Sequence, residues 1–127
     1  WMITVLDAIR GDEAWAQILT ANRYNTPPAP GMEYVLVWVR ARYIRPEETI
    51  TRIDSGWFKL SGAANVLHDA PSLVKPKPAL EAWLLAGGEV EGWVGLQARA
   101  GETDLRLVYA PLFDRDQSQR RYLALPE

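Results

Sequence analysis

The sequence predicts a mainly β fold, an Ig-like antiparallel β-sandwich of about seven strands with one short N-terminal helix. Three observations predict it. Short stretches rich in β-branched and aromatic residues recur along the chain, turn-forming residues separate them at short intervals, and 127 residues suit one domain. Strands this short and numerous bury their apolar faces best as two sheets packed face to face. We therefore expect residues 1–127 to form a single sandwich domain.

The first elements expected are a strand over 2–9 and a helix over 12–23. Apolar residues dominate the first stretch, and from residue 12 they recur at the spacing of one helical face. Asp12 is placed to cap the helix, because a carboxylate there can accept hydrogen bonds from free backbone amides. The prolines of 26–31 end the helix, since they lack amide donors and fix their φ angles.

The strongest predicted strand covers 34–44, where β-branched and aromatic residues are densest. Its side chains alternate between two faces, so that Val37 points inward and Trp38 points outward. The stretch 68–78 holds three prolines and is expected to be a long edge connection. The further strands are expected at 49–54, 57–60, 80–86, 90–98, 105–109 and 121–125.

Gly92 lies inside the strand expected at 90–98. A glycine there indicates a bulge or a bulky neighbour, such as an aromatic ring, packed over the bare backbone. Gly87 and Gly88 precede the same strand and supply the positive φ angles of a tight turn. These glycines predict structural roles rather than functional ones.

The charge balance argues against several classes of partner. The 14 Lys+Arg and 16 Asp+Glu give a net charge of −2, whereas a nucleic-acid binder must neutralise several phosphates at once. No apolar run approaches the ~20 residues that span a bilayer. The absence of cysteine excludes a disulfide scaffold, a Cys-based zinc site and a thiol nucleophile. We expect no nucleic-acid partner and no membrane insertion by the domain itself.

The catalytic inventory of the sequence is small. His68 is the sole histidine and is followed by an aspartate in the proline-rich stretch, where an exposed loop histidine is expected. The paired carboxylates Asp12/Glu13 are typical of a helix start, and Glu47/Glu48 are typical of a polar turn. An esterase-like enzyme, the least favoured alternative, would need a serine within about 3 Å of the His68 ring. We expect no catalytic residue and class the domain as non-enzymatic.

One loop resembles a cation site in part. Residues 114–118 carry oxygen ligands at alternate positions, as calcium loops do. The loop lacks the glycine and the distal glutamate of an EF-hand, so a hairpin loop is favoured. No Gly-rich phosphate cradle precedes a helix either. The sequence therefore predicts no cofactor and no metal.

Six tryptophans are the unusual feature of the composition. Trp38 and Trp93 point outward in the strand phasing, and Trp57 is a third candidate on its own strand. Exposed aromatic rings form stacking platforms for sugars or partner proteins, so these three make the candidate binding surface. The favoured alternative is that the helix buries Trp15 against this face, which turns the tryptophans into a second small core.

Several motifs together resemble a known family. The motifs are GDEAW at 11–15, ANRYN at 21–25, GMEYV at 31–35, GEVEGWV at 88–94 and RYLAL at 121–125. They resemble a bacterial extracellular domain family of unknown function, with an immunoglobulin-like sandwich, that is loosely named after telomeric repeat-binding factor. Members are secreted or lipid-anchored, so the resemblance implies an extracellular or cell-surface location. It also implies that an export or anchor segment preceded Trp1, and it implies no catalytic residues.

The sequence thus predicts a non-enzymatic extracellular interaction or spacer module of a bacterial cell-surface or secreted protein. Binding would use a sheet face or the proline-rich connections at 26–31 and 68–78, because loops on a rigid sandwich commonly carry recognition. The alternative is a carbohydrate-binding module with Trp38, Trp57 and Trp93 as an exposed, coplanar platform. The expected partner is a protein or a glycan at the cell surface.

Overall fold

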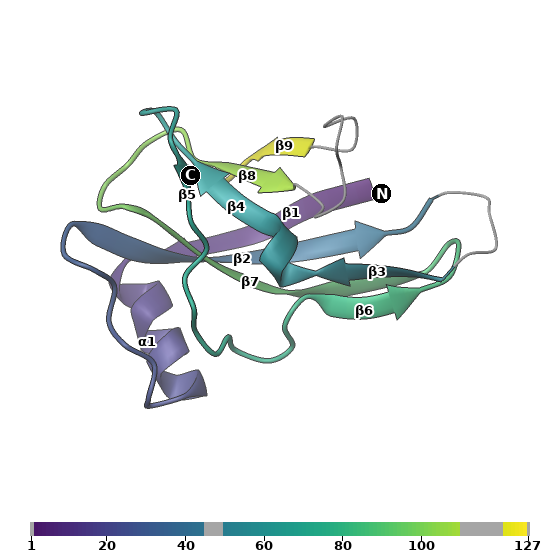
Figure 1. Ribbon diagram of the computed structural model, residues 1–127, viewed down its shortest axis with the longest axis horizontal. Coiled ribbons are helices and arrows are strands. Elements are labelled where there is room, and N and C mark those ends of the chain that lie inside the picture. Colours follow the sequence, from purple (N-terminus) through teal and green to yellow (C-terminus); the bar gives the residue numbers. More distant parts are fainter. Residues whose placement is uncertain (1, 45–49, 110–120, 127) are drawn as a thin grey trace.

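The computed structural model describes residues 2–44, 50–109 and 121–126. The fold is mainly β, with one α-helix beside the sheets (Figure 1). The elements are β1 (Met2–Arg10), α1 (Asp12–Ala21), β2 (Met32–Arg42), β3 (Thr51–Asp54), the 3-10 helix η1 (Ser55–Trp57), β4 (Phe58–Ser61), β5 (Leu67–His68), β6 (Glu81–Leu84), β7 (Glu89–Arg99), β8 (Arg106–Tyr109) and β9 (Arg121–Ala124).

The described strands form three antiparallel sheets. Sheet A has the order β1-β2-β7, sheet B is β3-β6, and sheet C has the order β5-β4-β8-β9. Sheet A packs against sheets B and C, because one apolar core takes side chains from all three (Figure 1). Its members include Val37 of β2, Ile53 of β3, Phe58 of β4 and Leu107 of β8. This shared core confirms the predicted β-sandwich with one helix.

A second, smaller core lies on the opposite face of sheet A. There Ala14 and Ile18 of α1 pack on Tyr34 and Leu36 of β2, and Trp93 is half-buried beside them. The favoured expectation that the helix packs over the sheet is therefore confirmed, although Trp93 is the only one of the three candidate tryptophans that belongs to this second core among the described residues. Because the alternate residues of β2 face the sandwich core, this strand is buried on both faces.

The helix α1 begins at the expected residue but without the expected cap. Gly11 occupies the N-cap position with φ 68°, and no side chain among the described residues caps the helix. The prediction that Asp12 is the cap is wrong, because β1 turns into the helix through a positive φ that glycine tolerates. Asp12 lies instead in the first turn, where the helix dipole favours negative charge. None of the described helices has the length and apolar character needed to cross a membrane.

The expected strands are present, with small changes at their ends, and one strand was missed. Leu67–His68 form the two-residue strand β5, which pairs with β4 at the start of the proline-rich connection. A strand this short carries no periodic pattern, so the sequence does not reveal it. The loop 114–118 and the carboxylates Glu47 and Glu48 lie outside the described residues.

Gly92 allows one backbone segment to cross another. Ala79 forms an isolated parallel bridge with Trp93, whose amide donates to the Pro78 carbonyl at 2.8 Å. The Leu80 amide donates to the Trp93 carbonyl at 3.0 Å, and a Cβ at Gly92 would lie 2.5 Å from the Leu80 nitrogen. The close neighbour is therefore backbone and not an aromatic ring. The pairing of β2 with β7 also continues through Gly92 without a bulge.

Candidate functional site

The three tryptophans of the predicted platform lie on two sides of sheet A. Trp38 and Trp93 are cross-strand neighbours on its outer face, with ring centroids 5.0 Å apart and ring planes at 65°. Trp57 lies in η1 rather than in a strand, and it packs against the core between the sheets. The structure thus brings two of the three together, edge to face, and places the third elsewhere.

The outer-face pair is partly enclosed. Both rings are half-buried, and Trp93 contacts the second core. Nε1 of Trp38 donates to Glu91 at 3.3 Å, and Arg40 donates to the other oxygen of the same carboxylate at 3.0 Å. The 65° angle between their planes shows that the two rings are not coplanar, as the predicted platform would require.

The tryptophan with the largest exposed fraction among the described residues is Trp83, at 69%. It lies in β6 directly opposite Arg52 of β3, and both side chains point away from the core that Ile53 enters. The Arg52 guanidinium carbon lies 5.8 Å from the ring centroid, which is a cation–π distance. Trp83 is therefore a large apolar ring that a regular strand presents to solvent.

Arg52 is held in place by two carboxylates. Its Nη2 donates to Glu81 at 2.5 Å and forms an ion pair with Oδ2 of Asp54 at 2.9 Å. Asp54 is fixed in turn, because its other oxygen accepts the Gly56 amide at 2.8 Å at the start of η1. The Nε of Arg52 is buried with no hydrogen-bond partner among the described residues. We call the outer surface made by Arg52, Asp54, Glu81 and Trp83 the Trp83 face.

Exposed apolar side chains extend the Trp83 face along its strands. Ile50 comes directly before Thr51, and Leu85 comes directly after Leu84, the residue that pairs with Thr51; their exposed fractions are 68% and 61%. An aromatic ring with apolar neighbours and fixed charges is typical of surfaces that bind partners. The face can therefore stack on a flat ligand while it donates and accepts hydrogen bonds.

Sequence reasoning missed Trp83 because apolar residues fill the stretch 82–86 and hide its alternation. The available signal was Glu81, since residues two apart in a strand share a face. A charged residue at that position marks the side of β6 that holds Trp83 as the outer one. No sequence signal points to Arg52 as its partner, because that pairing depends on the strand register.

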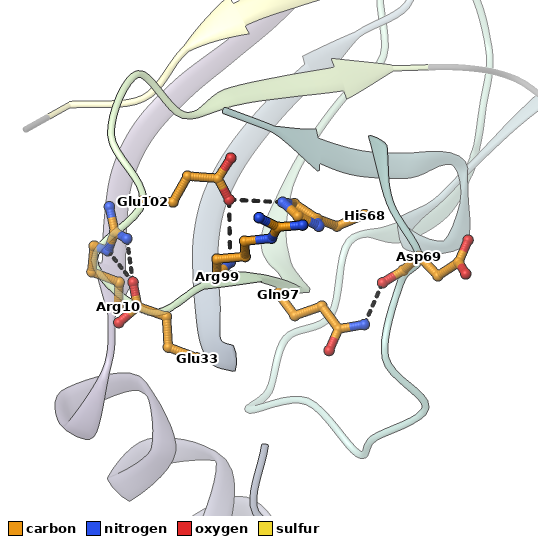
Figure 2. A network of polar contacts seen from close by, with 7 residues as sticks. All are labelled: Arg10, Glu33, His68, Asp69, Gln97, Arg99 and Glu102. Carbon is orange, nitrogen blue, oxygen red and sulfur yellow. Dashed lines mark hydrogen bonds and ion pairs between the residues drawn. The ribbon is translucent and has the colours of Figure 1, made fainter. Parts of the chain in front are cut away.

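His68 and Glu102 form a buried polar pair at the edge of sheet C (Figure 2). His68 is 8% exposed, and its Nε2 lies 2.7 Å from Oε1 of Glu102, whose side chain is 5% exposed. The same oxygen accepts the Arg99 amide at 3.2 Å. The expectation of an exposed loop histidine is wrong, because β5 brings His68 into sheet C opposite Leu60.

The contact with His68 stabilises the charged form of the buried Glu102 carboxylate. Burial by itself raises the pKa of Glu102, because loss of water disfavours the charged form. Hydrogen bonds from the His68 ring and from backbone amides, together with the charge attraction of His68, outweigh burial. The pKa of Glu102 therefore lies below its ordinary value of 4.5. The carboxylate fits closely over Gly62, where an added Cβ would collide with it.

A histidine beside a carboxylate resembles part of a hydrolytic triad, which also requires a nucleophile. Within the described ranges the His68 ring bonds to Glu102, and no hydrogen bond links it to a serine. The neighbouring Asp69 does not join the pair, because its side chain is 96% exposed. Nor do three or more His, Asp or Glu side chains of the described chain gather as a metal site would require. The pair is arranged as a structural anchor.

The remaining contacts of Figure 2 also join structural elements. Arg10 of β1 donates to Glu33 of β2 through two guanidinium nitrogens. Nε2 of Gln97 donates to the Asp69 carbonyl at 2.6 Å, which ties the start of the proline-rich connection to β7. These bonds hold the edge of the sandwich, and among the described residues they bring no further reactive group to His68.

The proline-rich connections proposed to carry recognition are fastened to the second core. The Tyr34 hydroxyl donates to the Thr26 carbonyl at 2.9 Å, which fixes the first connection. The Asn25 side chain exchanges two hydrogen bonds with the backbone of Val74, which fixes the second beside it. The structure thus brings the two connections together next to α1.

Comparison of the chain with protein-family models, with curated proteins and with solved structures gave no match. The family resemblance therefore stays a prediction, and the case for a function has to come from the residues themselves.

Proposed function

We propose that this domain is a non-enzymatic interaction module of a secreted or surface-anchored bacterial protein, and that it binds its partner through the Trp83 face. The observation that carries the proposal is the 69% exposure of Trp83 on a regular, paired strand. A side chain this large and apolar gains free energy when a partner removes it from water. The resemblance of the 88–94 motif supports an extracellular location.

The Trp83 face can bind without rearrangement. Arg52 is already fixed by Asp54 and Glu81, so little side-chain entropy remains to be lost when a ligand binds. Trp and Arg are also enriched among the few residues that dominate binding energies. A rigid ring beside a rigid guanidinium is thus suited to recognition.

A carbohydrate is the second candidate partner, and the polar groups around the ring favour it. The face of a tryptophan ring packs on the C–H face of a sugar, while fixed carboxylates accept and a guanidinium donates hydrogen bonds at the hydroxyl edge. The Trp83 face carries one positive charge on Arg52 and two negative charges on Asp54 and Glu81, so its net charge is negative. The glycan would therefore consist of neutral or amino sugars rather than acidic ones.

Trp83→Ala should weaken glycan binding by about tenfold or more, because a central aromatic ring commonly contributes on the order of 2 kcal/mol. The measurement is the retardation of the purified domain in native gels that contain neutral polysaccharides, chitosan or polyuronates. Tyr122→Ala is the matched control, since Tyr122 is 61% exposed but lies in β9 of sheet C. Circular dichroism of each variant confirms that the fold is kept.

The outcomes separate the two candidates. Binding that Trp83→Ala leaves unchanged would assign recognition to another surface and contradict the proposal. Retardation by polyuronates alone would contradict the charge preference. No retardation by any polymer would remove the glycan candidate and leave a protein partner.

A further inference from the structure

An apolar groove lies between α1 and the segment 74–77, which stand next to each other in Figure 1. Its volume is about 460 Å³. Ala16, Gln17, Thr20 and Ala21 form the helix wall, and Val74 and Pro76 belong to the opposite wall. The small helix side chains leave the space open, and the volume lies within the roughly 300–1,000 Å³ of small-molecule sites.

Asn25 fixes the spacing of the two walls. Its Oδ1 accepts the Val74 amide at 2.8 Å, and its Nδ2 donates to the Val74 carbonyl at 2.9 Å and to the Ile18 carbonyl at 3.0 Å. Leu73 packs on the second core, and the stem of Lys75 lies against β7. The wall 74–77 is thus anchored on both sides of Val74, and the groove is formed before any ligand arrives.

Two lysines give the groove its charge. Lys75 and Lys77 line it, and within the described part of the chain no acidic side chain does so and neither lysine forms an ion pair. A free ammonium group beside an apolar surface suits an amphiphile with a negative head, because the chain leaves water while the charges attract.

We infer that this groove binds a long-chain fatty acid, with the alkyl chain between α1 and 74–77 and the carboxylate on Lys75 or Lys77. A small ligand is favoured because a protein partner would bury roughly 800 Å² on each side, and the groove is bounded by short segments only. The site is separate from the Trp83 face and does not depend on the function proposed for it.

Competition of oleate with the fluorescent fatty acid cis-parinarate, on the whole chain, tests the inference. We expect saturable binding of one ligand per domain. Ala16→Leu should lower the affinity at least tenfold, because leucine fills the groove while it maintains the helix. Ala21→Leu is a second variant on the same wall. Lys75→Gln combined with Lys77→Gln should weaken oleate but not oleyl alcohol, and Lys59→Gln in β4 is the matched control.

Three other results would overturn the inference. Unchanged oleate affinity in folded Ala16→Leu and Ala21→Leu would place the ligand outside the groove. Equal affinity for oleate and oleyl alcohol would remove the carboxylate contact with the lysines. Binding to phosphatidylglycerol vesicles without binding of free oleate would assign the surface to a membrane lipid instead.

Discussion

Gly92→Ala should lower the free energy of unfolding by about 3 kcal/mol, the cost of inserting an atom where a packed interior has no room. The new Cβ would lie 2.5 Å from the Leu80 nitrogen and 2.6 Å from the Ala79 carbonyl carbon. Backbone cannot rotate away as the end of a side chain can, so the bridge between Ala79 and Trp93 has to open. The measurement is urea unfolding followed by tryptophan fluorescence.

Gly95→Ala is the matched control on the same strand. Its Cβ would meet Leu73 Cδ1 at 3.0 Å and Lys75 Cγ at 3.1 Å, and both are side-chain atoms that can shift. We expect a loss of less than about 1 kcal/mol at this position. Equal losses for the two variants would show that the crossing of the 78–80 backbone over β7 does not constrain Gly92.

His68→Ala should lower the free energy of unfolding by about 2–3 kcal/mol, because it leaves a buried carboxylate without its side-chain partner. The Glu102 side chain is 5% exposed and keeps its backbone contacts, which do not replace a ring nitrogen at 2.7 Å. Adding Glu102→Gln to His68→Ala should recover part of the loss, since a neutral amide is easier to bury than an unpaired charge. Strictly additive losses in this double-mutant cycle would contradict the pairing.

The same pair predicts a pH dependence of stability. The pKa of Glu102 is lower in the folded chain than its ordinary 4.5, so its charged form stabilises the fold above that pH. This contribution is lost as the pH falls through the lowered pKa. The wild type should therefore be more stable than Glu102→Gln at about pH 7. This difference in stability should disappear below about pH 4.5. A difference that persists undiminished at about pH 3 would show that the carboxylate charge is not what stabilises this edge.

The central strands could be predicted because each carries its signal locally. The stretch 34–44 is dense in β-branched and aromatic residues, and the structure makes it the middle strand of sheet A. The helix could be predicted in the same way, from the spacing of Trp15, Ile18 and Leu19. The helix has an apolar side that must be buried, and this need predicted that the helix covers the outer face of β2.

The candidate site could not be predicted, because it depends on pairings between distant segments. Trp83 stands beside a guanidinium only because the register of β3 and β6 places it opposite Arg52. His68 is buried only because a two-residue strand brings it to Glu102, which comes from the turn after β7. Local periodicity contains neither the register nor the partner, so the tryptophans chosen from strand phasing were Trp38, Trp57 and Trp93.

The burial of β2 on both faces also constrains how the chain is made. During synthesis β1 and α1 emerge before β2, but β7, which pairs along its full length, follows only after β3 to β6. Until then the nascent chain carries an apolar segment with an unpaired edge, and such segments associate readily with one another. Pairing between segments this far apart is also slow. The second edge of β2 therefore stays unpaired until β7, which ends at Arg99, has left the ribosome.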